Sequence, residues 1–141
     1  MAFTDIYRVS SSAMTAQTVR LNTIASNMAN ADAASASEET VYKARRPVFA
    51  SIYQNSQLAG NNAMAGARVQ IMDVVETGQA TQRYEPNHPM ANNQGYVYYP
   101  DINVVEEMAD MMSASRGFET SAEVLSSVKS MQQSLLRLGE V

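Results

Sequence analysis

Several residue types on which protein chemistry commonly depends are scarce or missing in this chain of 141 residues. It has no cysteine, which excludes disulfides, thiolate metal sites and cysteine nucleophiles. It has one histidine, His88, so a zinc site would have to be built mainly on carboxylates. No run of about 18 apolar residues occurs, and the N-terminal MAFTDIYRVS lacks the basic and apolar regions of a signal peptide. We therefore expect no metal, no cofactor, no membrane-spanning helix and no cleaved signal.

Clustered positive charge is also scarce. The net charge is -4 at pH 7, and the only basic cluster is KARR, Lys43 to Arg46. Binding to nucleic acids or to anionic membranes depends on clustered Lys and Arg, so the composition argues against both. The KARR cluster itself is either an anion site or, more commonly, a solvated strand edge that prevents edge-to-edge pairing.

Motifs of catalysis are absent as well. The sequence contains no G-x-S-x-G, no P-loop and no G-x-G-x-x-G. His88 stands between two prolines in PNHP, and the nearest carboxylate in sequence is Glu85, which is more typical of a loop histidine than of a general base. Glu106 and Glu107 could form a carboxylate pair, but on a long helix we expect them on its solvated face. We predict that the protein is not an enzyme and has no small-molecule substrate.

The N-terminal residues have the spacing of a long packing helix. Apolar and small residues alternate at intervals of three and four, which predicts a helix over 5–30 with Thr4 as its N-cap. The positions are Tyr7, Ser10, Met14, Gln17, Leu21, Ile24 and Met28. The rest of this helix carries few charges, whereas a helix exposed to water usually carries many. We infer that several of its sides are covered.

A second helix is predicted over 104–138. Asn103 and Glu106 form a capping-box pattern at its start, and Gly139 is a plausible end. Two apolar seams run along it and are displaced around its axis. The first consists of Met108, Met111, Ser115, Phe118, Ala122 and Leu125, and the second of Val124, Val128, Met131, Leu135 and Leu138. Two seams on one helix need more than one neighbour.

Between these helices the apolar period changes from three and four to two. Strands are predicted over 67–76, 41–49 and 95–99, separated by stretches rich in Asn, Gly and Pro. Pro47 indicates an edge strand or a break. The predicted fold is mainly α with a small β insert, and its long N- and C-terminal helices pack as a coiled-coil-like pair. Its segments are 1–32 (assembly helix), 33–100 (β-rich middle with loops) and 101–141 (assembly helix), which form one structural unit.

A chain of this size cannot cover both helices by itself. We therefore expect assembly with copies or relatives of the chain through the terminal helices, with the β insert projecting outward. The expected interface residues are Met14, Leu21, Ile24, Asn27, Met28, Asn30, Met108, Met111, Phe118, Leu125, Val128, Met131, Leu135 and Leu138.

Three stretches resemble a known family. They are SSSAMTAQTVRLNTIASNMANADA, YEPNHPMANNQGYVYYPDINVVEEM and MSASRGFETSAEVLSSVKSMQQSLLRLG. Together they resemble the bacterial flagellar basal-body rod proteins over nearly the whole chain, least so over 33–83. The ASNMANA segment is shared by rod and hook proteins generally. The more specific pattern is held by His88, Pro89, Ala91, Gly95, Tyr96, Val97 and Pro100.

The resemblance implies a structural subunit of the proximal rod that transmits torque. Members of the family pass unfolded through the flagellar type III export apparatus and assemble in the periplasm. The implied partners are copies of the chain, the other rod proteins, the adaptor FliE and the MS ring. The alternative from the residues alone is a soluble cytosolic coiled-coil adaptor that forms a closed dimer or bundle.

The segment IASNMANADA, residues 24–33, allows two interpretations of its asparagines. Asn27 and Asn30 lie on one side of the helix beside the apolar seam, where they could form hydrogen bonds between subunits at a lower desolvation cost than charges. Alternatively, Asn30 simply caps the helix. The two roles are compatible.

Overall fold

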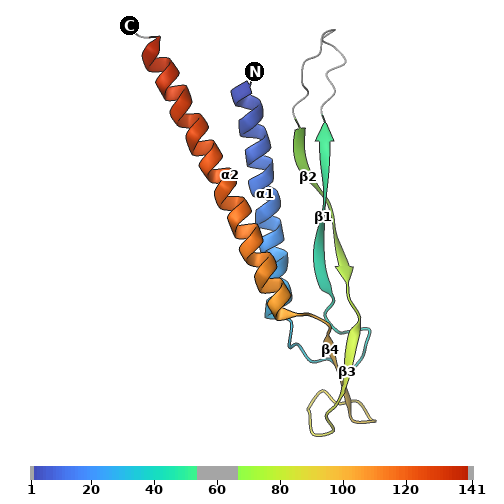
Figure 1. The fold of residues 1–141 in the computed structure, drawn as a ribbon. Helices are drawn as coiled ribbons and strands as arrows, with labels where there is room; N and C mark the ends of the chain where they lie inside the picture. Colours follow the sequence, from blue (N-terminus) through green and yellow to red (C-terminus); the bar gives the residue numbers. More distant parts are fainter. Residues whose placement is uncertain (1, 54–66, 140–141) are drawn as a thin grey trace.

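Two long helices run side by side, and the chain between them forms two β-hairpins (Figure 1). The computed structural model describes residues 2–53 and 67–139. Helices α1 (Ala2–Ala29) and α2 (Val104–Leu138) flank the strands β1 (Ala44–Tyr53), β2 (Ala67–Thr77), β3 (Ala80–Tyr84) and β4 (Tyr96–Pro100). The prediction of two long terminal helices with a small β middle is confirmed.

Helix boundaries follow the capping signals at α2 but not at α1. The Asn103 side chain accepts hydrogen bonds from the backbone N–H groups of Val105 and Glu106, and α2 ends at Gly139, as predicted. Helix α1 already begins at Ala2, so Thr4 lies inside it and is not its N-cap. A local cap pattern therefore located one helix start and misplaced the other by about one turn.

The strands form two separate antiparallel pairs, β1 with β2 and β3 with β4. In the first pair Pro47 lies opposite Val74, and the register shifts between Val48 and Phe49. Since both strands of a two-stranded sheet are edges, Pro47 occupies the edge position predicted for it. Strand β3 was not predicted, because ATQRY is short and has no alternation of apolar and polar residues.

Helix α1 lies between α2 and the β1–β2 hairpin and contacts both (Figure 1). Hydrogen bonds join it to the β side: the Ser12 hydroxyl accepts from Val69 N–H at 3.1 Å, and the Ser26 and Tyr42 hydroxyls lie 3.0 Å apart. This arrangement explains why α1 carries few charges, since its second side is covered by the chain's own hairpin. In a single copy this hairpin packs along α1, and its position in an assembly stays a prediction.

The buried core is built mostly of small residues. Among the described residues, Val97 and Asn27 are the largest side chains that are less than 2% exposed, and Ala114 on α2 is completely buried. At Gly117 a Cβ atom would lie 3.1 Å from the Gln17 amide nitrogen, so the absence of a side chain there allows Gln17 of α1 to pack closely. In the described part of the chain, neither helix is apolar enough over its length to cross a membrane.

Candidate assembly interface

Regularly spaced buried and half-buried positions mark the packed side of each helix. On α1 the predicted seam is confirmed as the packed side: Ile24 is buried, and Met14, Leu21 and Met28 are half-buried. On α2 the buried and half-buried positions repeat every seven residues in two rows. These rows are Glu107, Ala114, Ser121 and Val128, and Met111, Phe118, Leu125 and Gln132. Three residues of the first predicted seam, Met111, Phe118 and Leu125, lie in these rows, but only Val128 of the second seam does.

Most of the remaining apolar residues of α2 are exposed in two groups, and Leu136, which is 71% exposed, lies outside both. The first, near the start of the helix, consists of Val105, Met108 and Met112, and we call it the loop-end patch. The second, towards the end of the helix, consists of Val124, Met131, Leu135 and Leu138, and we call it the terminal patch. Within each patch the spacings of three, four and seven place the side chains on one face. At 3.6 residues per turn the two patches lie on different sides of α2.

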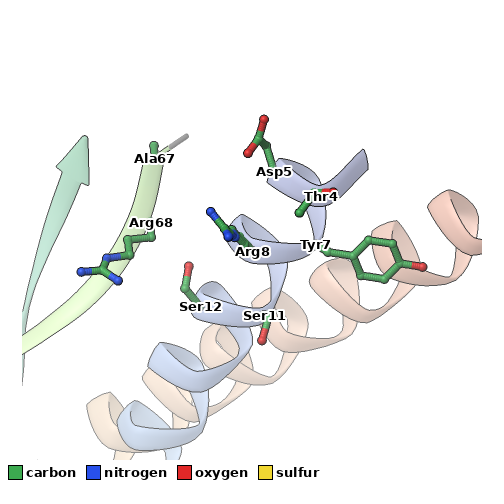
Figure 2. Close-up of a pocket in the computed structure, with 8 residues that line it drawn as sticks. All are labelled: Thr4, Asp5, Tyr7, Arg8, Ser11, Ser12, Ala67 and Arg68. Atoms are coloured by element: carbon green, nitrogen blue, oxygen red, sulfur yellow. The ribbon is translucent and has the colours of Figure 1, made fainter. Parts of the chain in front are cut away.

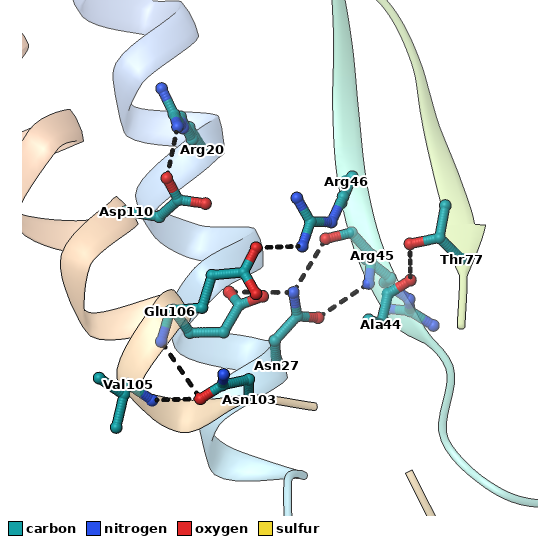
Figure 3. Close-up of polar contacts among 11 residues, drawn as sticks. Arg20, Asn27, Ala44, Arg45, Arg46, Thr77, Asn103, Val105, Glu106 and Asp110 are labelled. Carbon is teal, nitrogen blue, oxygen red and sulfur yellow. Dashed lines mark hydrogen bonds and ion pairs between the residues drawn. The ribbon is translucent and has the colours of Figure 1, made fainter. Parts of the chain in front are cut away.

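Asn27 joins three elements of the chain (Figure 3). It is 1% exposed, and its amide oxygen accepts from Arg45 N–H at 2.8 Å and from the Tyr42 hydroxyl at 3.0 Å. Its amide nitrogen donates to the Arg45 carbonyl at 3.0 Å and to the Glu107 carboxylate at 3.3 Å. A side-chain amide offers two donors and two acceptor positions. All are used inside the chain, so Asn27 ties α1 to β1 and α2 and has no hydrogen bond free for a neighbouring subunit.

Glu107 is buried, whereas its sequence neighbour Glu106 is exposed. Glu107 is only 5% exposed, so the expectation that both Glu106 and Glu107 lie on a solvated face is wrong for Glu107. The local sequence could not reveal this, because its partner Asn27 is 80 residues away. Around this contact Arg20 pairs with Asp110 at 2.9 Å, and Arg46 of the KARR cluster pairs with Glu106 at 3.5 Å (Figure 3). These ion pairs are exposed or half-exposed, so they contribute less to the stability of the fold than the hydrogen bonds of the buried Asn27 amide.

Asn30 closes the end of α1. Its side-chain amide donates to the Ser26 carbonyl at 2.8 Å, and its backbone N–H lies 3.2 Å from the same carbonyl. Carbonyls in the last turn of a helix have no partner within the helix. The capping interpretation of Asn30 therefore agrees with this geometry.

The loop that carries the HP and GYV residues is held by its own polar groups. The backbone N–H of Met90 donates to Nδ1 of His88 at 3.1 Å, which uses one ring nitrogen of this histidine within the loop. Gly95 has a φ of 82°, and a Cβ atom there would lie 2.9 Å from the Tyr84 ring. Burial, with the Glu85 carboxylate that accepts from its hydroxyl, raises the pKa of Tyr99 above its ordinary value.

We predict that Asn27→Ala lowers the stability of the isolated chain. The change leaves the buried carboxylate of Glu107 and the N–H of Arg45 without these hydrogen bonds, at a cost of about 1–3 kcal/mol. Urea unfolding of the purified chain measures this cost. Asn22→Ala is the matched control, because Asn22 is exposed on the same helix and its loss should be almost neutral. Equal stabilities of the two variants would contradict the role assigned to Asn27.

Two family models match the parts of the sequence that contain the two helices. A family model described as flagella basal body rod protein matches residues 8–34, which lie mostly in α1. A second, described as flagellar basal body rod FlgEFG protein C-terminal, matches residues 93–138, which include β4 and α2. Both matches cover the helices that form the intrachain seam.

Relatives that match over most or all of their length are also flagellar basal-body rod proteins. The flagellar basal-body rod protein FlgC of Escherichia coli O157:H7 is 41% identical over 99% of this chain and 100% of its own length. The FlgC proteins of Salmonella typhimurium strain LT2 and Borreliella burgdorferi are 39% and 33% identical, over 99% and 92% of this chain and 100% and 93% of their own lengths. The resemblance found in the sequence is thereby confirmed, and the chain belongs to the FlgC family of flagellar basal-body rod proteins, which are structural proteins of the rod and not enzymes.

Proposed function

We propose that the chain is a subunit of the proximal rod that assembles with its own copies and with other rod proteins through the exposed apolar residues of α2. The observation that carries this proposal is the presence of the loop-end and terminal patches on different sides of one helix. Leu135 is 55% exposed and Leu138 is 74% exposed, although both continue the apolar spacing of the helix. Covering such side chains contributes roughly 1.5–3 kcal/mol each.

Two patches on different sides favour an open assembly over a closed one. A closed dimer joins identical surfaces across a two-fold axis, and one patch would be enough for it. An open assembly needs a subunit to meet different neighbours with different surfaces. The arrangement on α2 therefore supports a rod subunit more than the alternative of a closed cytosolic adaptor.

Of the predicted interface residues, those that remain exposed are Met108, Met131, Leu135 and Leu138. We assign these four to contacts between subunits. Ile24, Val128 and their half-buried neighbours in the seam act mainly by holding α1 against α2. We further propose export through the flagellar type III apparatus, contacts with the adaptor FliE and the MS ring, and a role in transmitting torque. These points rest on the family resemblance.

The proposed function is tested by removing the gene and isolating basal bodies. Cells without the chain should make no complete rod and should not swim, and expression of the wild-type chain should restore both. Antibody against the chain should label the rod of restored basal bodies in electron micrographs. Recovery of the chain only from the cytoplasm, with complete rods in its absence, would instead favour the adaptor.

A further inference from the structure

Methionine is the most easily oxidised residue type of this chain. The sequence has ten methionines but no cysteine and no tryptophan. Hydrogen peroxide converts a methionine to its sulfoxide, and a side chain that is exposed reacts more readily than one that is covered. The positions of the methionines on the surface therefore decide where an oxidant can act.

The methionines of the described residues divide into two groups by exposure. Met1 and Met64 lie outside the described residues. Met14, Met28 and Met111 are half-buried on the packed sides of α1 and α2. The exposed ones, with exposed fractions between 43% and 62%, are Met72, Met90, Met108, Met112 and Met131. Three of these exposed thioethers belong to the loop-end and terminal patches of α2.

The loop-end patch presents two thioethers one helical turn apart. Met111 and Met112 are consecutive residues of α2, but Met111 is half-buried and Met112 is 60% exposed. Met108 stands four residues before Met112, so the two lie on the same face of the helix. Met108 is 48% exposed. In a single copy, an oxidant in solution therefore reaches both sulfur atoms of the patch.

In the terminal patch, the packing of Gln132 leaves its neighbour Met131 on the surface. Figure 2 shows the Tyr7 side chain of α1 directed towards α2, where its hydroxyl donates to the Gln132 side-chain oxygen at 3.4 Å. Successive residues of a helix are rotated by about 100° around its axis, so Met131 lies away from the side that meets Tyr7. Met131 is 50% exposed, and Leu135 of the same patch follows about one turn later.

We propose that Met108, Met112 and Met131 of the unassembled chain are a site of reversible oxidation, and that their sulfoxides block assembly. The inference rests on the proposed function and adds a regulation of the same patches. Hydrogen peroxide transfers one oxygen atom to the sulfur: an S–O bond forms, the peroxide O–O bond breaks, the sulfur loses two electrons and water is released. A polar sulfoxide then replaces an apolar thioether. A subunit that covered the patch would bury the sulfoxide oxygen without a donor, which opposes association.

Only one state of the chain is sensitive to the oxidant. Before assembly the thioethers of α2 are in contact with solvent, whereas a neighbour that covers the patches shields them. Methionine sulfoxide reductases reverse the reaction: two thiols of the reducing system form a disulfide, the sulfoxide oxygen leaves as water and the thioether is restored. Oxidation therefore acts on the supply of subunits and leaves finished rods unchanged.

The first test measures the oxidation rate of each methionine in the purified wild-type chain. After timed exposure to hydrogen peroxide, peptide mass spectrometry gives the sulfoxide fraction at each position, and fragment ions separate Met111 from Met112. We expect Met108, Met112 and Met131 to oxidise at least about fivefold faster than Met111, because Met111 is half-buried in the same helix. In purified basal bodies the rates at the three exposed positions should fall at least about fivefold. Equal rates at Met111 and Met112 in the free chain, or unchanged rates in basal bodies, would overturn the proposal.

The second test measures whether a polar oxygen at these positions blocks assembly. Glutamine resists peroxide, carries a polar oxygen near the position of the sulfoxide oxygen, and has about the helix propensity of methionine. In cells without the wild-type gene, Met108→Gln with Met112→Gln and Met131→Gln should give at least about tenfold fewer complete rods. Leucine at the same three positions keeps the surface apolar and should give normal rods. Met72→Gln with Met90→Gln, which changes exposed methionines outside α2, should also give normal rods.

The outcomes of the second test separate this inference from the proposed function. Normal rods in the triple glutamine variant, or an equal loss in the triple leucine variant or in the variant at positions 72 and 90, would overturn the inference. None of these results alters the gene-removal experiment, in which the proposed function fails only if complete rods form without the chain. The rate measurement uses the wild-type chain, so it decides the question even where a variant fails to fold.

Discussion

Leu135→Asp should abolish complete rods and swimming while leaving the isolated chain folded. Leu135 is 55% exposed in the terminal patch, so a carboxylate there costs little in a single copy. Once a neighbouring subunit covers the patch, the same carboxylate is left buried and unpaired, at a cost of several kcal/mol per interface. Because the cost recurs at every subunit, we expect assembly to fail rather than to slow. Rods counted in electron micrographs of basal bodies, together with swimming, measure the effect.

Gln133→Asp is the matched control for this substitution. It introduces the same side chain two positions earlier, on an exposed part of α2 away from the terminal patch. A change in helix stability caused by an acidic residue near the C-terminus should affect both variants similarly. Normal rods in Gln133→Asp and none in Leu135→Asp would assign the loss to the patch. Normal swimming in both variants would remove the terminal patch from the assembly interface.

The elements that sequence analysis predicted best are those with long repeats or strong caps. Helix α2 was predicted with the bounds that the structure has, because Asn103 and Gly139 mark its ends and apolar spacing fills the interval. Strand β2 was found from its alternation over 67–76. Strand β3 was missed, since its pairing with β4 decides its conformation and its own residues do not.

The site was predicted less well than the fold, because its contacts join distant parts of the chain. The low charge of α1 correctly indicated a covered helix, but the cover on one side is the chain's own hairpin. Asn27 was predicted to form hydrogen bonds between subunits, yet its partners Tyr42, Arg45 and Glu107 lie in other segments of the same chain. Periodicity identified the packed side of α1, but on α2 it also selected Met108, Met131, Leu135 and Leu138, which are exposed in a single copy. Only the tertiary structure separates the buried residues from the exposed ones.

The same distribution of contacts predicts uneven stability along α2. Near the loop end Glu107 and Ala114 are buried against α1, and Ile24, Asn27 and Val97 lie in the same part of the molecule. Beyond Val128 the side chains of α2 are largely exposed, which leaves the last turns with little tertiary support. Amide hydrogens in such segments exchange through local opening. In the isolated chain we therefore expect slow exchange over 107–118 and fast exchange over 131–138.

Assembly should reverse this difference, because a neighbour that covers the terminal patch adds contacts that the single chain lacks. Hydrogen exchange measured by mass spectrometry on purified rods and on the dilute chain should show protection of 131–138 increasing by roughly 100-fold or more. Residues 107–118 provide the internal reference, since their contacts are already made within one copy and should change much less. Uniform protection along α2 in the dilute chain, or no gain over 131–138 in the rod, would mean that the terminal patch is not where subunits meet. A gain confined to the terminal patch would identify α2 as a helix that one copy stabilises at its start and the assembly stabilises at its end.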